Sequence, residues 1–340
     1  MVEIVVAAPG QLTLRPDANP PPPGRDEVVL RVERAGICGS DIHILHGSNP
    51  FARYPRIIGH EFAGEVAAIG DAVEGLVPGE TVVIDPVLPC GHCYPCRIGR
   101  PNVCANLQVL GVHRDGGFRR HATVPARCCV KVPDGLALDI ATLAEPFAVA
   151  ANVLSRAGIE EEDTVLIYGA GTVGLTVLQV AKLHGARCLV SDPDTARLER
   201  AKAFGADRVI DPRHETVPDA VRAEHECLGP SLIIDGAGIP ALLAEACAVA
   251  SPAARIGLLG FSATPSTVVQ QQIVGKELSL VGSRLNRGFV AQAVAWLAEG
   301  RLKPAAMITH SFAASDARAA FDLIERDPAS TIKVQLDFNA

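Results

Sequence analysis

The sequence predicts an α/β protein made of a β-rich unit and a doubly wound parallel sheet. Short β-branched runs broken by turn residues fill the first third of the 340 residues. From about Thr164, apolar strands alternate with glycine turns and amphipathic helices, which is typical of crossover-connected parallel strands. With 48% hydrophobic and 20% charged residues, the chain can bury the cores of roughly two domains.

The β-rich unit is expected to be compact and barrel-like, because its strands are short and separated by turns. Its strands are predicted at residues 27–32, 61–69, 80–84, 120–124 and 131–133. Four consecutive prolines lie between Asn19 and Gly24. Successive prolines cannot serve a sheet ladder, so this stretch is predicted to be a surface loop.

The part of the chain from about Thr164 is predicted to form six short strands, with a helix after the first of them. The strands are predicted at residues 164–168, 188–191, 208–210, 232–234, 255–259 and 278–281, and the helix at 174–183. Such a series favours a parallel sheet with crossover connections. After Gly282 the pattern loosens, leaving one clear helix at 290–297 and a last strand at 332–336.

Charge and cysteine content narrow the function classes. The net charge of -7, without a dense basic stripe, argues against nucleic acid or an anionic membrane as partner. The start lacks a cationic flank before a long apolar stretch, so a cytoplasmic protein without a membrane partner is expected. Ten cysteines in such a chain indicate metal binding or catalysis rather than disulfides.

A glycine fingerprint opens the second unit. Gly169, Gly171 and Gly174 follow a predicted strand and begin a predicted helix. Gly169 would make the tight turn, Gly171 would let the backbone approach a pyrophosphate, and Gly174 would allow close helix–strand packing. The helix start at Thr172 and Val173 would supply amide donors for the phosphates. The pattern predicts a dinucleotide-binding site.

An acid follows the next predicted strand. The Asp192 carboxylate is placed to accept hydrogen bonds from the adenosine ribose and to repel a 2′-phosphate, which favours NAD over NADP. Its alternative role is a solvated turn carboxylate before Pro193. Arg197 could lie along the adenine or soften the discrimination against NADP.

Four cysteines within fifteen residues predict a closed metal site. The set is Cys90, Cys93, Cys96 and Cys104. Four thiolates on a glycine- and proline-rich segment suit a tetrahedral structural Zn²⁺. An iron–sulfur cluster is the alternative, but nothing else in the sequence requires electron transfer.

A second, open zinc site is predicted from three separate segments. Cys38, with Ser40 and His43 after it, follows a strand, His60 and Glu61 follow Gly59, and Glu145 interrupts an apolar stretch. One thiolate, one imidazole and one or two carboxylates form a catalytic-type shell. Each residue also has a plain structural role: a core cysteine, a hydrogen-bonded histidine or a helix cap. Adjacent strand residues face opposite sides, so His60 and Glu61 can both ligate only if the chain turns at Gly59.

These motifs, in this order, resemble the zinc-dependent medium-chain dehydrogenases. The matching segments are residues 36–43, 59–61, the four-cysteine lobe, 144–146 and the glycine fingerprint. The resemblance implies a GroES-like catalytic domain of residues 1–147 and 288–340 with the zinc lobe at about 88–106. It also implies a Rossmann NAD-binding domain of residues 148–287, with the active site between the two. A homodimer or homotetramer joined through strand 278–281 is implied as well.

The resemblance further implies an NAD-dependent alcohol dehydrogenase acting on CH–OH donors. Glu145 stands where relatives acting on simple alcohols have a second cysteine, which resembles the polyol, sugar-acid and threonine branch. There Cys38, His60 and Glu61 match the zinc ligands, with Glu145 ligating directly or through water. Residues 54–61, 110–118 and 282–284 are similar to L-galactonate 5-dehydrogenase-type enzymes.

The predicted chemistry is reversible oxidation of a secondary alcohol, with zinc as Lewis acid and a hydride passed to the nicotinamide. Ser40 would take the alcohol proton and pass it through the ribose toward His43. Arg284 would bind the carboxylate of a sugar acid, and His113 would border the pocket. Sorbitol- or xylitol-type polyols and L-threonine are the alternative substrates. A zinc hydrolase or a non-catalytic zinc and NAD(H)-binding redox sensor is the alternative of another class.

Overall fold

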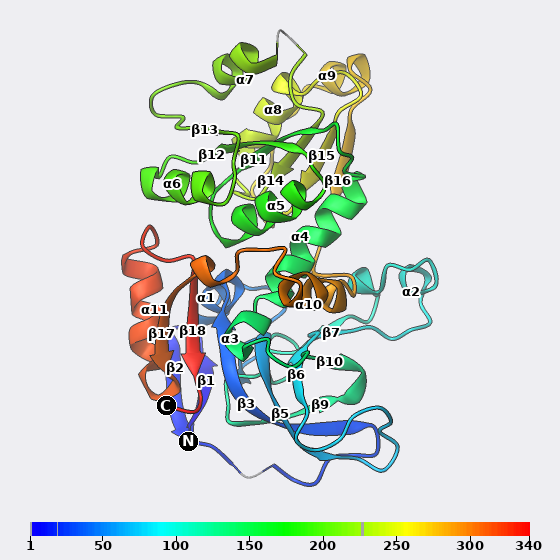
Figure 1. The fold of residues 1–340 in the computed structure, drawn as a ribbon, viewed down its shortest axis with the longest axis vertical. Helices are drawn as coiled ribbons and strands as arrows, with labels where there is room; N and C mark the ends of the chain where they lie inside the picture. Colours follow the sequence, from blue (N-terminus) through cyan, green and yellow to red (C-terminus); the bar gives the residue numbers. More distant parts are fainter. Residues whose placement is uncertain (1, 19, 226–227) are drawn as a thin grey trace. The chain divides into compact units, whose positions relative to one another are not determined.

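The computed structural model describes residues 2–18, 20–225 and 228–340. The chain forms two compact units: a β-rich unit of Met1–Ala148 with Asn286–Ala340, and a parallel-sheet unit of Val149–Leu285. Both ends of the chain therefore belong to the β-rich unit, and Figure 1 shows them beside each other near β1 and β18. The proline loop has neither helix nor strand over residues 20–24, and Asn19 lies outside the described residues.

The β-rich unit contains sheets of three, seven and two strands. Its strands are β1 (Val2–Ala8), β2 (Gln11–Pro16), β3 (Glu27–Ile37), β4 (Arg56–Ile57), β5 (Glu61–Ile69), β6 (Thr81–Ile84), β7 (Val87–Leu88), β8 (Gln108–Val109), β9 (His121–Pro125), β10 (Cys129–Lys131), β17 (Ile308–Ala313) and β18 (Lys333–Asp337). The seven-stranded sheet runs β10-β6-β5-β3-β18-β17, with β9 paired to β3. The chain's last strand, β18, thus lies between β3 and the edge strand β17.

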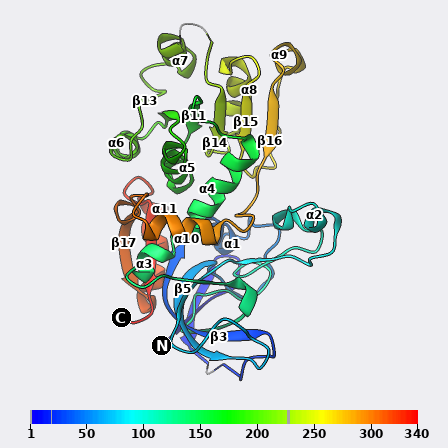
Figure 2. The ribbon, with the colours of Figure 1, turned by 45° about the vertical axis from the view of Figure 1, so that its right-hand side comes forward.

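The helices of this unit are short apart from the two near the C-terminus. They are α1 (Gly39–Leu45), α2 (Tyr94–Arg97), α3 (Leu138–Ala141), α10 (Val290–Ala298) and α11 (Ala317–Arg326). Figure 2 shows the lobe with α2 projecting away from β3 and β5. Helix α4 (Ala144–Ala157) connects the two units, and the apolar stretch Leu138–Ala157 that includes it is long enough to span a membrane but is 72% buried within the structure.

The other unit contains one sheet of six parallel strands in the order β13-β12-β11-β14-β15-β16. Its strands are β11 (Thr164–Tyr168), β12 (Arg187–Ser191), β13 (Arg208–Ile210), β14 (Leu232–Asp235), β15 (Arg255–Leu258) and β16 (Ser279–Gly282). Its helices are α5 (Thr172–Leu183), α6 (Thr195–Ala203), α7 (Val217–His225), α8 (Pro240–Val249) and α9 (Gln270–Gly275). The central strand β14 is buried at every residue, as expected for a sheet covered on both faces. The expected doubly wound sheet is confirmed.

Three sequence predictions at the element level need correction. The strand expected at 131–133 is wrong, because pairing with β6 uses Cys129–Lys131 and a short 3₁₀ turn precedes it. Strand β3 continues to Ile37, five residues beyond its predicted end, and so reaches the first residue of the open metal site. The pair β1 and β2, strand β17 and helix α11 were not predicted at all.

Candidate functional site

Three donor atoms of the β-rich unit converge. A Cys38 sulfur, a His60 ring nitrogen and a Glu61 carboxylate oxygen lie within 4.8 Å of one another. Cys38 follows β3 as the N-cap of α1, while His60 immediately precedes β5 and Glu61 begins it. The β3–β5 pairing brings the two segments together, with Gly36 opposite Glu61.

Gly59 makes the turn that lets two neighbouring residues face the same centre. Its φ is +90°, and a Cβ there would overlap the Phe118 ring. A side chain at this position would therefore be strained and without space. The turn that the sequence analysis required of Gly59 is present, because the donor atoms of both His60 and Glu61 belong to the cluster.

Asp41 links the segment that carries Cys38 to the segment that carries His60 and Glu61. The sequence analysis did not assign it a role. It is fully buried, and its Oδ2 accepts the Cys38 amide at 2.9 Å while its Oδ1 accepts the Gly59 amide at 3.2 Å. Oδ1 also lies 3.6 Å from Nδ1 of His60. A carboxylate behind a ligating imidazole orients the ring and raises its basicity. The available sequence signal was an acid in the third position of a helix.

The His60 ring fits a metal ligand. Its Nδ1 faces Asp41, 3.6 Å from Oδ1, so the ring nitrogen available to an ion is Nε2, which lies 3.4 Å from the Ser40 hydroxyl. With one sulfur, one nitrogen and one oxygen donor in reach, the cluster matches the mixed donor set of catalytic Zn²⁺.

Glu145 lies in the first turn of α4 and is 4% exposed. Its carboxylate is not part of the three-residue cluster. Burial raises its pKa to about 7, while the nearby charge of His60 acts in the opposite direction. Its role as a zinc ligand stays a prediction.

Lys333 is the other residue that the sequence analysis did not identify. It begins β18, is 2% exposed, and its Nζ lies 2.8 and 2.6 Å from the two carboxylate oxygens of Glu61. Burial favours the neutral amine, but the Glu61 charge and hydrogen bonds outweigh it and raise the pKa of Lys333. The buried Lys333 ammonium group therefore lies directly beside the donor cluster of Cys38, His60 and Glu61.

The other predicted site residues of this unit are Ser40, His43 and His113, and their contacts do not assign them a function. Ser40 contacts His60 as described, whereas His43 is exposed and its Nδ1 lies 3.0 Å from the Ser48 hydroxyl. His113 accepts the Val109 amide at 3.2 Å. A relay from Ser40 to His43 and a pocket contact of His113 stay predictions.

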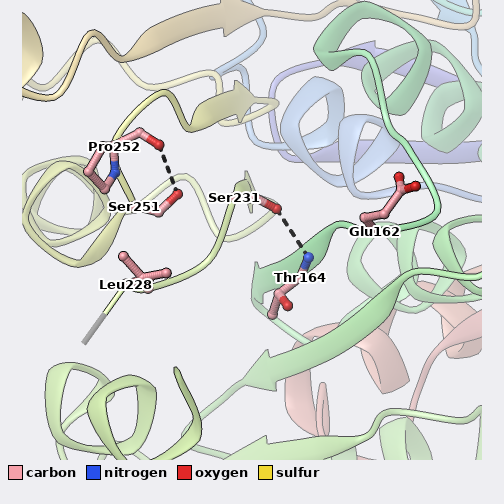
Figure 3. A pocket seen from close by; sticks show the side chains of 7 residues that line it. Glu162, Thr164, Leu228, Ser231, Ser251 and Pro252 are labelled. Atoms are coloured by element: carbon pink, nitrogen blue, oxygen red, sulfur yellow. Dashed lines mark hydrogen bonds between the residues drawn. The ribbon is translucent and has the colours of Figure 1, made fainter. Parts of the chain in front are cut away.

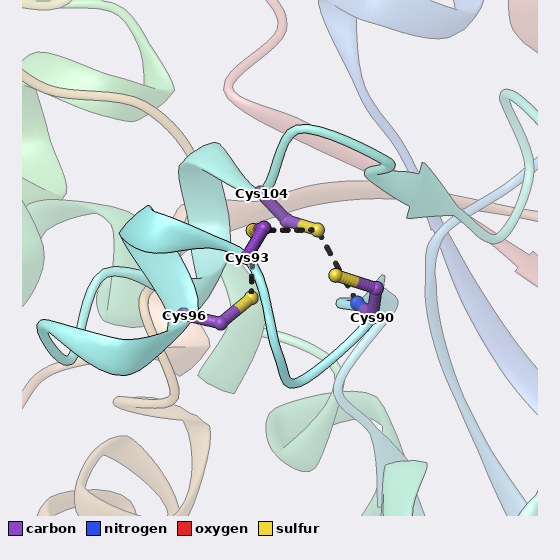
Figure 4. A group of neighbouring side chains, drawn as sticks. All are labelled: Cys90, Cys93, Cys96 and Cys104. Atoms are coloured by element: carbon purple, nitrogen blue, oxygen red, sulfur yellow. Dashed lines mark hydrogen bonds between the residues drawn. The ribbon is translucent and has the colours of Figure 1, made fainter.

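The four-cysteine lobe contains α2, and Figure 4 shows the sulfur atoms of its four cysteines turned toward one another. The Cys93 sulfur lies 3.4 Å from that of Cys96 and 3.6 Å from that of Cys104, too far for a disulfide. All four thiols, including that of Cys90, lie within 4.8 Å of one another. They have the closed arrangement expected around a tetrahedral ion.

Backbone amides around the lobe point at sulfur. Cys104 Sγ accepts the amides of Cys90 at 3.2 Å and Asn106 at 3.3 Å, and Cys93 Sγ accepts that of Ala105 at 3.4 Å. Amide hydrogen bonds, first that of His92, lower the pKa of Cys90 to about 6. Such bonds stabilise thiolates, which are the form that ligates zinc.

The glycine fingerprint has the geometry predicted for it. Gly169 has a φ of +90° at the end of β11, and a Cβ on Gly174 would overlap the carbonyl oxygen of Gly169. Gly171, by contrast, has open space within 4 Å of an added Cβ. Helix α5 begins directly after it, at Thr172 and Val173. The turn therefore leaves open space beside Gly171, whereas at Gly174 helix α5 packs against the end of β11 without space for a side chain.

Asp192 is 4% exposed and follows β12. Its two oxygens accept the amides of Ala170 and Asp194, each at 2.8 Å, and Arg197 Nη1 lies 3.9 Å from Oδ2. This burial disagrees with a solvated turn carboxylate. A pocket of about 500 Å³ adjoins it, lined by Pro193, Asp194, Thr195, Ala196 and Arg213.

A second pocket of about 370 Å³ lies where the central strands β11 and β14 begin, beside Thr164 and Ser231 (Figure 3). Its hydroxyls are engaged locally: Ser231 accepts the Thr164 amide at 3.1 Å, and Ser251 donates to the Pro252 carbonyl at 3.2 Å.

Arg284, predicted to bind a substrate carboxylate, lies with its guanidinium carbon 5.9 Å from the centre of the Phe261 ring. Burial lowers the pKa of Arg284.

Comparison with known families matches both units. Residues 24–134 match the alcohol dehydrogenase GroES-like domain, and residues 172–299 match the zinc-binding dehydrogenase family. The expected GroES-like and Rossmann-type architecture is therefore confirmed.

Curated relatives cover most of the chain. The starvation-sensing protein RspB of Escherichia coli K12 is 47% identical over 100% of each sequence. A solved structure of the rspB alcohol dehydrogenase from E. coli CFT073, complexed with NADH, has a TM-score of 0.95, 47% identity and 99% coverage of both chains. L-galactonate-5-dehydrogenase of E. coli K12 is 32% identical over 86% of each sequence, and L-threonine 3-dehydrogenase of Pyrococcus horikoshii is 38% identical over 83% of this chain and 82% of its own.

Proposed function

Because the chain belongs to the zinc-dependent medium-chain dehydrogenases, we propose that it oxidises a secondary alcohol of a sugar acid or polyol with NAD, in the manner of an L-galactonate 5-dehydrogenase. The observation that carries the proposal is the convergence of Cys38, His60 and Glu61 on one centre. The similarity to L-galactonate-5-dehydrogenase supports the substrate class. L-threonine is the second candidate, supported by the similarity to L-threonine 3-dehydrogenase.

The side chains of the β-rich unit would hold the substrate and a zinc ion. Cys38 and His60 would ligate the ion together with a carboxylate, either Glu61 or Glu145. A bound zinc ion supplies Lewis acidity, which lowers the pKa of an alcohol hydroxyl. Ser40, whose hydroxyl lies 3.4 Å from His60, would accept the alcohol proton and pass it toward His43.

The parallel-sheet unit would hold NAD. Gly171 leaves space for a pyrophosphate at the start of α5, where the helix dipole favours anions. Asp192, buried at the end of β12, would accept the ribose hydroxyls and disfavour a 2′-phosphate. Arg284 would bind a substrate carboxylate with its planar guanidinium.

We propose a second zinc ion at Cys90, Cys93, Cys96 and Cys104, and assembly of a cytoplasmic homodimer or homotetramer. The edge position of β16 in its sheet and the exposed Leu280 on it support association there. Light scattering coupled to size exclusion measures the oligomer, and a monomer would contradict this part.

The test of function is a screen of NAD reduction, followed at the reduced-nicotinamide absorbance band, over hexonates, hexitols, pentitols and threonine. Cys38→Ser should abolish turnover and remove about one zinc per chain. Cys129→Ser, a change outside the two proposed zinc sites, should keep wild-type turnover and zinc content. Tight NADH binding without turnover of any candidate would favour a redox sensor. Absence of NADH binding would favour a zinc hydrolase.

A further inference from the structure

Two aspartates follow neighbouring strands of the parallel sheet. Strands β12 and β13 are paired with Ser191 opposite Ile210, and Asp192 and Asp211 are the next residues along the two strands. The Asp192 amide donates to the Ile210 carbonyl at 3.2 Å, which continues the pairing beyond β12. The backbone at Asp211 therefore lies next to the backbone at Asp192, the acid proposed to accept the ribose hydroxyls.

Asp211 binds the Arg213 guanidinium through both of its carboxylate oxygens. Its Oδ1 accepts a hydrogen bond from Nε of Arg213 at 2.9 Å, and its Oδ2 accepts one from Nη2 at 2.6 Å. Oδ1 also accepts the backbone amide of Arg213 at 3.0 Å. Nη2 further donates to the Thr195 hydroxyl at 2.9 Å. These contacts hold Arg213 in one orientation between the end of β13 and the first residue of α6.

The Arg213 side chain lines the pocket of about 500 Å³ that adjoins Asp192. Residues 193–196, the turn after β12 and the start of α6, form the rest of its lining. Among the described residues that line it, Arg213 is the basic one and Asp194 is the acidic one. An arginine near the ribose is the group that accommodates a 2′-phosphate in Rossmann units that bind NADP. By its location, Arg213 has the position of such an arginine.

The Asp211 carboxylate opposes that use of Arg213. Hydrogen bonds from Arg213 lower the pKa of Asp211 to about 2, so the acid is charged at neutral pH. Bidentate recognition of a phosphate needs two adjacent donors of the guanidinium, and Asp211 already uses Nε and Nη2. A 2′-phosphate beside Arg213 would also meet the negative charges of Asp192, Asp194 and Asp211. The pocket therefore contains an arginine whose charge is already balanced.

We propose that Asp211 is a specificity-determining residue: by pairing with Arg213, it keeps the pocket beside Asp192 from accepting the 2′-phosphate of NADP. Selectivity for NAD then has two separate determinants, because Asp192 acts on the ribose and Asp211 acts on the adjacent pocket. The inference rests on the proposed NAD-binding function and adds a residue to it. It is independent of the alcohol that the protein oxidises.

Fluorescence titration of the full chain with NADH and with NADPH measures the two Kd values without turnover. Asp211→Asn removes the charge and keeps an acceptor for the Arg213 backbone amide. It should lower the Kd of NADPH about tenfold or more and leave that of NADH within about twofold, because a charge-assisted hydrogen bond to phosphate becomes available. Calorimetry with adenosine 2′,5′-bisphosphate and adenosine 5′-monophosphate should show the same gain for the 2′-phosphate in the adenosine half alone.

Two control variants separate the effect of Arg213 from that of net charge. Asp219→Asn removes the same charge from another aspartate–arginine pair, the one with Arg222 on α7, and should leave both Kd values unchanged. Asp211→Asn combined with Arg213→Ala should lose the gain for NADPH. A gain in Asp219→Asn, or a gain that persists in the double variant, would show general charge repulsion and overturn the inference.

The Arg213 side chain is 52% exposed, so its ion pair contributes little to stability and Asp211→Asn should fold. Asp211→Ser, which also keeps a short acceptor, provides the same test if Asp211→Asn does not bind NADH. Unchanged NADPH affinity in a variant that retains NADH binding would overturn the inference and leave the proposed function intact. A wild type that binds neither nucleotide would instead refute the proposed NAD-binding function.

Discussion

Substitution of two glycines in the fingerprint separates close packing from nucleotide approach. Gly171→Ala places a methyl group where no atom lies within 4 Å, and the backbone φ of -76° suits alanine. Gly174→Ala places one 2.9 Å from the carbonyl carbon of Gly169 and closer still to its oxygen. The two variants add the same atoms to the same turn, so each serves as the control for the other.

The contacts set different magnitudes for the two changes. Gly171→Ala should change the free energy of unfolding by less than about 0.5 kcal/mol, because nothing is displaced. It should raise the Kd of NADH about tenfold or more, since the methyl group occupies the path of the pyrophosphate. Gly174→Ala overpacks the helix against the strand, which costs about 1–3 kcal/mol and should lower Tm by several degrees.

Thermal unfolding followed by circular dichroism and fluorescence titration with NADH measure both quantities. Gly171→Ala should retain the wild-type Tm and lose affinity, and Gly174→Ala should lose both. Wild-type affinity in Gly171→Ala would refute the assignment of the pyrophosphate to this turn. Wild-type Tm in Gly174→Ala would refute the packing argument.

Four further outcomes are expected. Cys96→Ser should lower the zinc content by about one ion per chain by elemental analysis and make the lobe sensitive to proteolysis; full zinc content would contradict four-thiolate ligation. Cys38→Ser should reduce kcat by about 1000-fold or more at unchanged lobe zinc, and residual wild-type turnover would refute the open site. Asp192→Ser should improve kcat/KM with NADP relative to NAD by about 10-fold or more, because the repelling carboxylate is gone and Arg213 lines the adjacent pocket; an unchanged ratio would place the discrimination elsewhere. Arg284→Ala should raise KM for sugar acids by about 10-fold while leaving polyols unaffected, and an equal effect on both would exclude a carboxylate contact.

Local pattern predicted the parallel sheet well, because each of its strands is a short apolar run followed by a turn. Strand β11 (Thr164–Tyr168) has the predicted bounds, and so does β5 (Glu61–Ile69). Strand β17 (Ile308–Ala313) was missed because its residues are only half-buried and show no clear alternation. Its stability comes from parallel pairing with β18, a partner that local pattern does not reveal.

Spacing alone made the donor residues of the site candidates, because each lies beside a glycine or interrupts an apolar stretch; the resemblance to zinc-dependent medium-chain dehydrogenases joined them into one set. Asp41 was less visible, since an acid in the first turn of a helix is ordinary and its contacts to Cys38 and Gly59 depend on tertiary structure. Lys333 had no local signal at all. A lysine at the start of a strand is normally a solvated residue, and its 2% exposure results from its position in the sheet.

The ion pair between Lys333 and Glu61 becomes readable only when the strand order is known. Glu61 and Lys333 are brought together because the C-terminal strand pairs with β3 rather than with its chain neighbours alone. Gly36 then carries information that its own sequence context lacks: a missing side chain in a middle strand permits residues of the two flanking strands to meet.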